Sequence, residues 1–168
     1  MGKQYLCGMD LILLHVTNEK MKQKIVVETI AFLFIVLFVY AAVTKLMDYE
    51  KFSIQLGQSP MLTAFAHWLA WIVPGIEILI SVCLAIPLLR LYAFYSAFSL
   101  MVMFTAYIIA ILNFSTYIPC SCGGVLERLT WQEHLVFNLV FVVLAAAGVI
   151  LLTSKAEREV TVFSDQSC

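Results

Sequence analysis

The sequence has few charged residues: Lys, Arg, Asp and Glu together make up only 12% of its 168 residues. A soluble domain carries about 25% charged residues and is about half apolar, whereas 62% of this chain is hydrophobic. One domain of this length has too little interior to bury that excess. We therefore expect lipid to cover much of its surface.

The sequence also lacks an excess of either sign of charge, because ten Lys and Arg nearly balance eleven Asp and Glu. Proteins that bind nucleic acid carry a basic patch, so we expect no nucleic-acid partner. A cleavable signal peptide is not expected, since the first apolar run starts late and lacks a cleavage site of small residues at its end. Met21-Lys22-Gln23-Lys24 is a typical start for a membrane protein, so we interpret residues 1–20 as an upstream extension.

Long apolar runs dominate the rest of the chain, at about residues 25–46, 65–88, 91–113 and 132–153. Each matches the ~20 residues that a helix needs to cross ~30 Å of hydrocarbon. Short loops make consecutive helices antiparallel neighbours. The sequence therefore predicts an all-α membrane protein, an up-down bundle of four transmembrane helices over residues 25–153. A polar lead at 1–24 and a tail at 154–168 flank the bundle.

The distribution of Lys and Arg predicts the orientation of this bundle. With the N-terminus inside, the cytoplasmic segments hold Lys3, Lys20, Lys22, Lys24, Arg90, Lys155 and Arg158. The outer segments hold only Lys45, Lys51 and Arg128. We therefore expect both termini in the cytoplasm, and the loops 47–64 and 114–131 on the outer face.

Cys120 and Cys122 are the only cysteines that are close in sequence, on the second outer loop between Pro119 and Gly123-Gly124. A disulfide between them would close a very small, strained ring, and strained exposed disulfides exchange readily. A structural disulfide stabilises more by closing a long loop. The spacing therefore favours a redox role over a structural one. Cys7, Cys83 and Cys168 lie on or near the cytoplasmic side and are assigned no role.

Two other interpretations of this cysteine pair stay open. The thiols could bind a metal together with His67 or His134, although the spacing matches no zinc finger or ribbon, so no metal site is predicted. They could also be reduced and inert.

Glu77 lies near the middle of the second apolar run, where an ionised carboxylate is costly and usually marks a functional path or a paired site. Lys45 could bend inward to pair with it, or extend outward to the interface. A structural pair and a proton-relay role are equal alternatives. Further candidate partners are Tyr107, Asn113, His134 and Asn138.

His134 starts the fourth apolar run, close in sequence to the cysteines. Its imidazole could lower a thiol pKa or carry a proton during exchange, or simply be satisfied by loop carbonyls. We expect the three tryptophans, Trp68, Trp71 and Trp131, to anchor the outer interface.

Stripes of small and polar residues predict the packing faces of the last two helices. The third run carries Tyr92, Ser96, Ser99, Met103, Ala106, Ala110 and Asn113. The fourth carries His134, Asn138, Phe141, Ala145 and Gly148.

An ordered set of motifs runs along about residues 21–153. Its members are Phe38-Val39-Tyr40-Ala41-Ala42-Val43-Thr44-Lys45-Leu46 with Phe52, Gln58-Ser59-Pro60, Pro74-Gly75-Ile76-Glu77, Phe104-Thr105-Ala106-Tyr107-Ile108, Pro119-Cys120-Ser121-Cys122-Gly123-Gly124, and Trp131-Gln132-Glu133-His134-Leu135 with Asn138. This set resembles the MauE/DoxX group of small four-helix membrane proteins, especially its redox-associated MauE-like branch.

The resemblance implies a role linked to disulfides. MauE-like proteins are associated with methylamine utilisation, where the family member is thought to support maturation of a disulfide-rich periplasmic dehydrogenase subunit. DoxX-like relatives are linked to sulfur and quinone redox chemistry. By this resemblance Cys120 and Cys122 are the redox pair, and Lys45 and Glu77 are the polar residues of the bundle. A quinone cofactor follows only by analogy.

We therefore predict a thiol–disulfide exchange protein of the bacterial inner membrane, a candidate oxidoreductase with a periplasmic client or redox partner. Cys120 and Cys122 would react and His134 would tune them. Lys45, Glu77 and Asn138 form a candidate cofactor-binding cluster. The alternatives are a non-catalytic scaffold or accessory subunit, and a small proton-coupled transporter that uses Glu77.

Overall fold

The computed structural model describes residues 3–58, 63–114 and 130–165, and every element in these ranges is helical. In chain order the elements are α1 (Lys3–Met47), α2 (Tyr49–Gln58), the short 3₁₀ helix η1 (Thr63–Phe65), α3 (Ala66–Ala85), α4 (Arg90–Phe114) and α5 (Trp131–Asp165).

Four helical segments among the described residues are long and apolar enough to cross a membrane: Thr17–Met47, Thr63–Ala85, Arg90–Asn113 and Trp131–Ser154. This confirms the predicted all-α membrane fold with four spans. The cytoplasmic placement of both termini stays a prediction.

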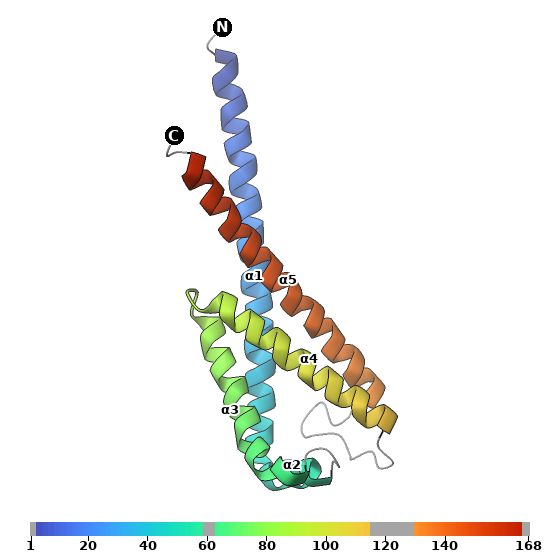
Figure 1. Ribbon diagram of the computed structural model, residues 1–168. Coiled ribbons are helices and arrows are strands. Elements are labelled where there is room, and N and C mark those ends of the chain that lie inside the picture. Colours follow the sequence, from blue (N-terminus) through green and yellow to red (C-terminus); the bar gives the residue numbers. More distant parts are fainter. Residues whose placement is uncertain (1–2, 59–62, 115–129, 166–168) are drawn as a thin grey trace.

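The long helices form a ring in which α1 and α4 each pack against both α3 and α5 (Figure 1). The first turn of α1 and the last turn of α5 lie at one end of this bundle. The helix α2 lies at the other end, against α3. We call this second end the α2 end.

The middle of the bundle is filled by aromatic side chains from different helices. The rings of Phe94 and Phe141 stand edge-on to the ring of Phe34, with centroids 6.2 and 5.2 Å away. Gly148 of α5 lies against the fully buried Phe94 of α4. A Cβ at residue 148 would lie 2.7 Å from the Phe94 ring, so the close packing of α4 and α5 requires glycine there.

The stripe predicted on the fourth apolar run, now part of α5, is confirmed as a packing face, because Asn138, Ala145 and Gly148 are buried. The prediction for the third apolar run, now α4, is wrong, because most residues of its stripe are exposed. These are Tyr92, Ser96, Ser99, Met103, Ala106 and Asn113. The buried face of α4 consists instead of Ala93, Phe94, Ala97, Leu100, Met101, Thr105, Ile108 and Ile111.

The physical reason is that two polar side chains of the exposed stripe, Ser96 and Asn113, are satisfied within α4. The Ser96 hydroxyl donates to the Tyr92 carbonyl oxygen at 3.0 Å, and the Asn113 amide donates to the Ile109 carbonyl oxygen at 2.8 Å. Such bonds to the preceding turn let a polar side chain face outward. Large apolar residues then occupy the interior.

The helix α2 was not predicted, since residues 47–64 read as a loop. Its side chains at Phe52, Gln55 and Leu56 are buried. This spacing of three and four residues places them on one face of the helix. Phe52 and Leu56 pack on Ala66 and Ala70 of α3, whose small side chains let α2 approach closely.

An ion pair joins α1 to the α3–α4 turn at the end opposite α2. The Arg90 guanidinium contacts the Glu28 carboxylate at 2.7 Å and donates to the Leu84 carbonyl oxygen at 3.2 Å. Because the second bond satisfies a carbonyl in the last turn of α3, Arg90 joins the end of that helix to α1.

Candidate functional site

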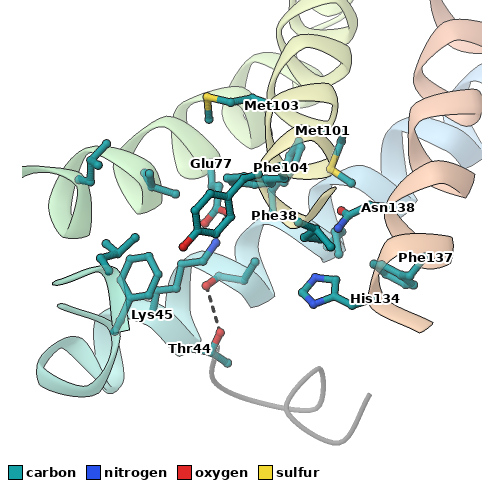
Figure 2. Close-up of a pocket in the computed structure, with 18 of the residues that line it drawn as sticks. Phe38, Thr44, Lys45, Glu77, Met101, Met103, Phe104, His134, Phe137 and Asn138 are labelled. Atoms are coloured by element: carbon teal, nitrogen blue, oxygen red, sulfur yellow. Dashed lines mark hydrogen bonds and ion pairs between the residues drawn. The ribbon is translucent and has the colours of Figure 1, made fainter. Parts of the chain in front are cut away.

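A cavity of about 230 Å³ lies near the α2 end, and all five α-helices contribute to its wall. Most of its lining is apolar or aromatic (Figure 2). The lining residues are Leu37, Phe38, Ala41, Thr44, Lys45, Phe52, Leu56, Leu69, Val73, Glu77, Met101, Met103, Phe104, Tyr107, Ile108, Trp131, His134, Phe137 and Asn138. The predicted cluster of Lys45, Glu77 and Asn138 and the predicted thiol-tuning residue His134 thus line the same cavity.

Lys45 and Glu77 form an ion pair across the cavity wall, from the Lys45 ammonium to Oε1 of Glu77. The Glu77 side chain is 0% exposed and the Lys45 side chain is 16% exposed. Of the two predicted orientations of Lys45, the structure therefore has the inward one. The Phe52 and Phe104 rings lie 5.8 and 5.2 Å from the ammonium and favour the cation there.

Glu77 lies on the inward face of α3, one turn after Pro74. Because proline has no backbone N–H, it leaves a helix carbonyl without its usual donor and adds polarity to this part of α3. One turn further on, the Ser81 hydroxyl donates to the Glu77 carbonyl oxygen at 2.8 Å. The backbone that carries Glu77 is thus held by a buried hydrogen bond.

The start of α5 is fixed by a capping box at Thr130 and Glu133. The Thr130 N–H donates to the Glu133 carboxylate at 2.8 Å, and the Glu133 N–H donates to the Thr130 hydroxyl at 3.3 Å. This reciprocal pair fixes the first turn of a helix. The Thr-x-x-Glu signal was present in the sequence and was missed.

The first two turns of α5 carry Trp131, His134 and Asn138 along the cavity wall. The rings of Trp131 and His134 stack, with centroids 6.5 Å apart and planes 22° apart. Trp68 and Trp71 are exposed, as expected for interface anchors, whereas Trp131 is half-buried in the site. Interpreting Trp131 simply as an interface anchor therefore missed its contribution to the cavity.

Three buried polar atoms, on residues that line this cavity, have no hydrogen-bond partner among the described residues: Oε2 of Glu77, Nδ1 of His134 and Nδ2 of Asn138. We call them the open polar atoms. Burying a polar group without a hydrogen bond is costly, and nearly all such groups in proteins have a partner. Three open polar atoms in one cavity indicate a place for a polar ligand.

Other candidates lie at or outside the cavity margin. Tyr107 lines the cavity, whereas Asn113 is exposed on α4. His67 is exposed and its Nδ1 lies 2.9 Å from the Tyr49 hydroxyl, in the contact between α2 and α3. Within the ranges that the structure describes, no group of three or more His, Cys, Asp or Glu side chains could hold a metal ion.

Cys120 and Cys122 lie outside the described residues, in the connection between α4 and α5. The chain enters α5 directly after this connection, and the first turn of α5 supplies Trp131 and His134 to the cavity. Cys83 is half-buried on α3 and packs against the bundle core.

Residues 23–151 match the model of a family described as methylamine utilisation protein MauE. The matched range contains the cavity residues and both predicted redox cysteines. The match supports the MauE part of the resemblance and does not extend to DoxX. No curated protein and no solved structure matches the chain.

Proposed function

The chain belongs to the MauE family, and on that premise we propose that it is a membrane thiol–disulfide exchange protein whose reacting groups are Cys120 and Cys122. In this proposal the protein resides in the bacterial inner membrane and its α2 end faces the periplasm. Its clients are periplasmic proteins whose disulfides it helps to form.

The observation that carries the proposal is the polar site at the start of α5. The connection bearing Cys120 and Cys122 leads straight into the turn held by the Thr130–Glu133 capping box. That turn presents His134 to the cavity. His134, which follows the cysteines closely in the sequence, carries an imidazole that can accept or return a proton during exchange.

Disulfide exchange with the client needs no further oxidant or reductant. A client thiolate attacks one sulfur of the Cys120–Cys122 disulfide and displaces the other as a thiolate, forming a mixed disulfide. The second client thiolate then attacks the client sulfur of that bond. The client gains a disulfide, and Cys120 and Cys122 receive two electrons and two protons.

The proposal predicts a reversible two-electron couple at this pair. The purified full-length chain is equilibrated in glutathione buffers, quenched with acid, alkylated and mapped by mass spectrometry. Cys120 and Cys122 should convert together, with a midpoint above the ~−300 mV typical of structural disulfides. The half-buried Cys83 should be alkylated as a thiol throughout and serves as the internal reference.

A pair that stays oxidised in every buffer would instead indicate a structural disulfide, as in a scaffold. Cysteines that only form separate mixed disulfides with glutathione would show that they do not act as a pair. Either result would reject the exchange function.

A further inference from the structure

The cavity near the α2 end has the size and lining of a site for one ring-shaped apolar molecule. An apolar cavity of ~150 Å³ is known to hold a benzene molecule, and this one has a volume of about 230 Å³. Its wall includes the aromatic rings of Phe38, Phe104, Trp131 and Phe137. Four of the five helices in the wall are candidate membrane spans, which favours a lipid-soluble ligand.

The open polar atoms restrict the chemistry of that molecule. Nδ2 of Asn138 is a donor and needs an acceptor oxygen, whereas Oε2 of an ionised Glu77 accepts and needs an O–H or N–H. Nδ1 of His134 can take either role. In Figure 2, Asn138 and His134 lie together on one side of the site, and Lys45 and Glu77 lie on the other. The ligand therefore carries polar groups on a ring that is otherwise apolar.

Charge selects against an ionic ligand. The ammonium of Lys45 and the carboxylate of Glu77 already neutralise each other, and the rest of the lining is largely apolar. A charged ligand would be desolvated here without an opposite charge left to pair with. A plain lipid tail would leave all three open polar atoms without partners.

We propose that this cavity binds the ring of a quinone from the bilayer, with Asn138 donating a hydrogen bond to a ring oxygen. A quinone oxygen accepts a hydrogen bond, and the hydroquinone that it becomes also donates one. Both forms therefore find partners among the open polar atoms of Asn138, His134 and Glu77.

This inference rests on the proposed function for its redox step. Each client disulfide leaves Cys120 and Cys122 as a dithiol, which must be reoxidised before the next turnover. The dithiol and one quinone give one disulfide and one hydroquinone. Two S–H bonds break, one S–S bond and two O–H bonds form, and two electrons pass from sulfur to the ring. Quinones maintain an oxidising bacterial periplasm by this type of exchange.

The test measures binding separately from thiol chemistry. The full chain carrying both Cys120→Ser and Cys122→Ser is placed in lipid nanodiscs and titrated with decylubiquinone, with quenching of tryptophan fluorescence as the readout. We expect saturable binding at one site per chain. Phenyldecane, which has a ring and tail but no oxygens, should not compete. Non-saturable quenching or equal competition by phenyldecane would overturn the inference.

A pair of variants on this background assigns the site. Asn138→Leu should raise the Kd of decylubiquinone about 10-fold or more, since a polar contact to a buried group is lost. Ser96→Ala is the control: Ser96 is exposed on α4, donates to the Tyr92 carbonyl oxygen of its own helix and does not line the cavity. It should leave the Kd within about twofold. An unchanged Kd in Asn138→Leu would place the quinone elsewhere.

Stability distinguishes a ligand-binding role of Asn138 from a structural one. Because Nδ2 of Asn138 has no partner among the described residues, Asn138→Leu should keep or raise the melting temperature while it weakens binding. A clear fall in melting temperature together with unchanged binding would show a packing role and contradict the inference.

Failure of this inference can be told apart from failure of the proposed function. If the wild-type chain exchanges disulfides with a reduced client but decylubiquinone does not bind, the quinone site is wrong and the exchange function stands. If decylubiquinone binds at Asn138 but the chain exchanges no disulfide, the quinone site stands. The exchange function and the redox step are then wrong.

Discussion

Replacing Cys120 or Cys122 by Ser is expected to slow disulfide transfer to a reduced client protein by about 10³-fold or more, as when a covalent nucleophile is removed. A single remaining cysteine cannot form the internal disulfide that the client attacks. It can only form a mixed disulfide that no second thiol resolves. The measurement is the rate at which the oxidised full-length chain converts a reduced model protein, followed by acid quench and alkylation.

Cys83→Ala is the control for this pair of variants. Cys83 is half-buried on α3, packs against the bundle core and lies outside the cavity lining. Its replacement should leave the transfer rate unchanged. If both outer variants transfer disulfides at the wild-type rate, the cysteines are not the reacting groups. A scaffold role would then account better for the family membership.

Removing one partner of the Lys45–Glu77 pair should destabilise the bundle by about 3–5 kcal/mol, as breaking a buried ion pair usually does. Glu77→Gln leaves the largely buried ammonium of Lys45 without its partner carboxylate. Lys45→Met likewise leaves the fully buried Glu77 without its cation. Unfolding of the purified chain in mixed detergent micelles, with increasing sodium dodecyl sulfate, measures the loss.

The double variant, Lys45→Met with Glu77→Leu, gives the sharper test of this pair. Replacing both charges by apolar groups removes the uncompensated charge, so the double variant should recover most of the stability lost in either single variant. Additive losses would show that the two side chains do not stabilise each other in the bundle.

The ion pair at the opposite end supplies a matched control. Glu28 pairs with Arg90 at 2.7 Å, but its side chain is 47% exposed. Exposed pairs contribute about 0–1 kcal/mol, so Glu28→Gln should have a much smaller effect than Glu77→Gln. Equal effects would mean that burial does not determine the cost of losing a carboxylate in this protein.

The four spans could be predicted from the sequence because length and hydropathy are local properties of each run. The helix α2 was missed because its buried face, Phe52 with Gln55 and Leu56, is short and has meaning only against Ala66 and Ala70 of α3. The same limit explains the wrong stripe on α4. Small and polar residues such as Ser96 can satisfy themselves within their own helix and face outward.

The grouping of Lys45, Glu77 and Asn138 could be predicted from the sequence, but the choice between the two orientations of Lys45 and the place of Trp131 in the cavity wall could not. An ionised carboxylate inside an apolar run is costly, and this cost singled out Glu77, whereas Asn138 was chosen from the polar stripe on the fourth run and from the family resemblance. The inward orientation of Lys45 depends on Phe52 and Phe104, which come from α2 and α4 and are distant in the sequence. The open polar atoms are a property of three-dimensional packing, so no sequence pattern could have revealed them.

Thiol trapping in intact cells tests the central claim, an outward-facing and reversible Cys120–Cys122 disulfide, most directly. A membrane-impermeant maleimide is applied with and without prior mild reduction, and the labelled peptides are mapped. The proposed function predicts that Cys120 and Cys122 are labelled only after reduction and that Cys83 is labelled in neither condition. Absence of labelling at Cys120 and Cys122 in both conditions, or full labelling without reductant, would contradict it.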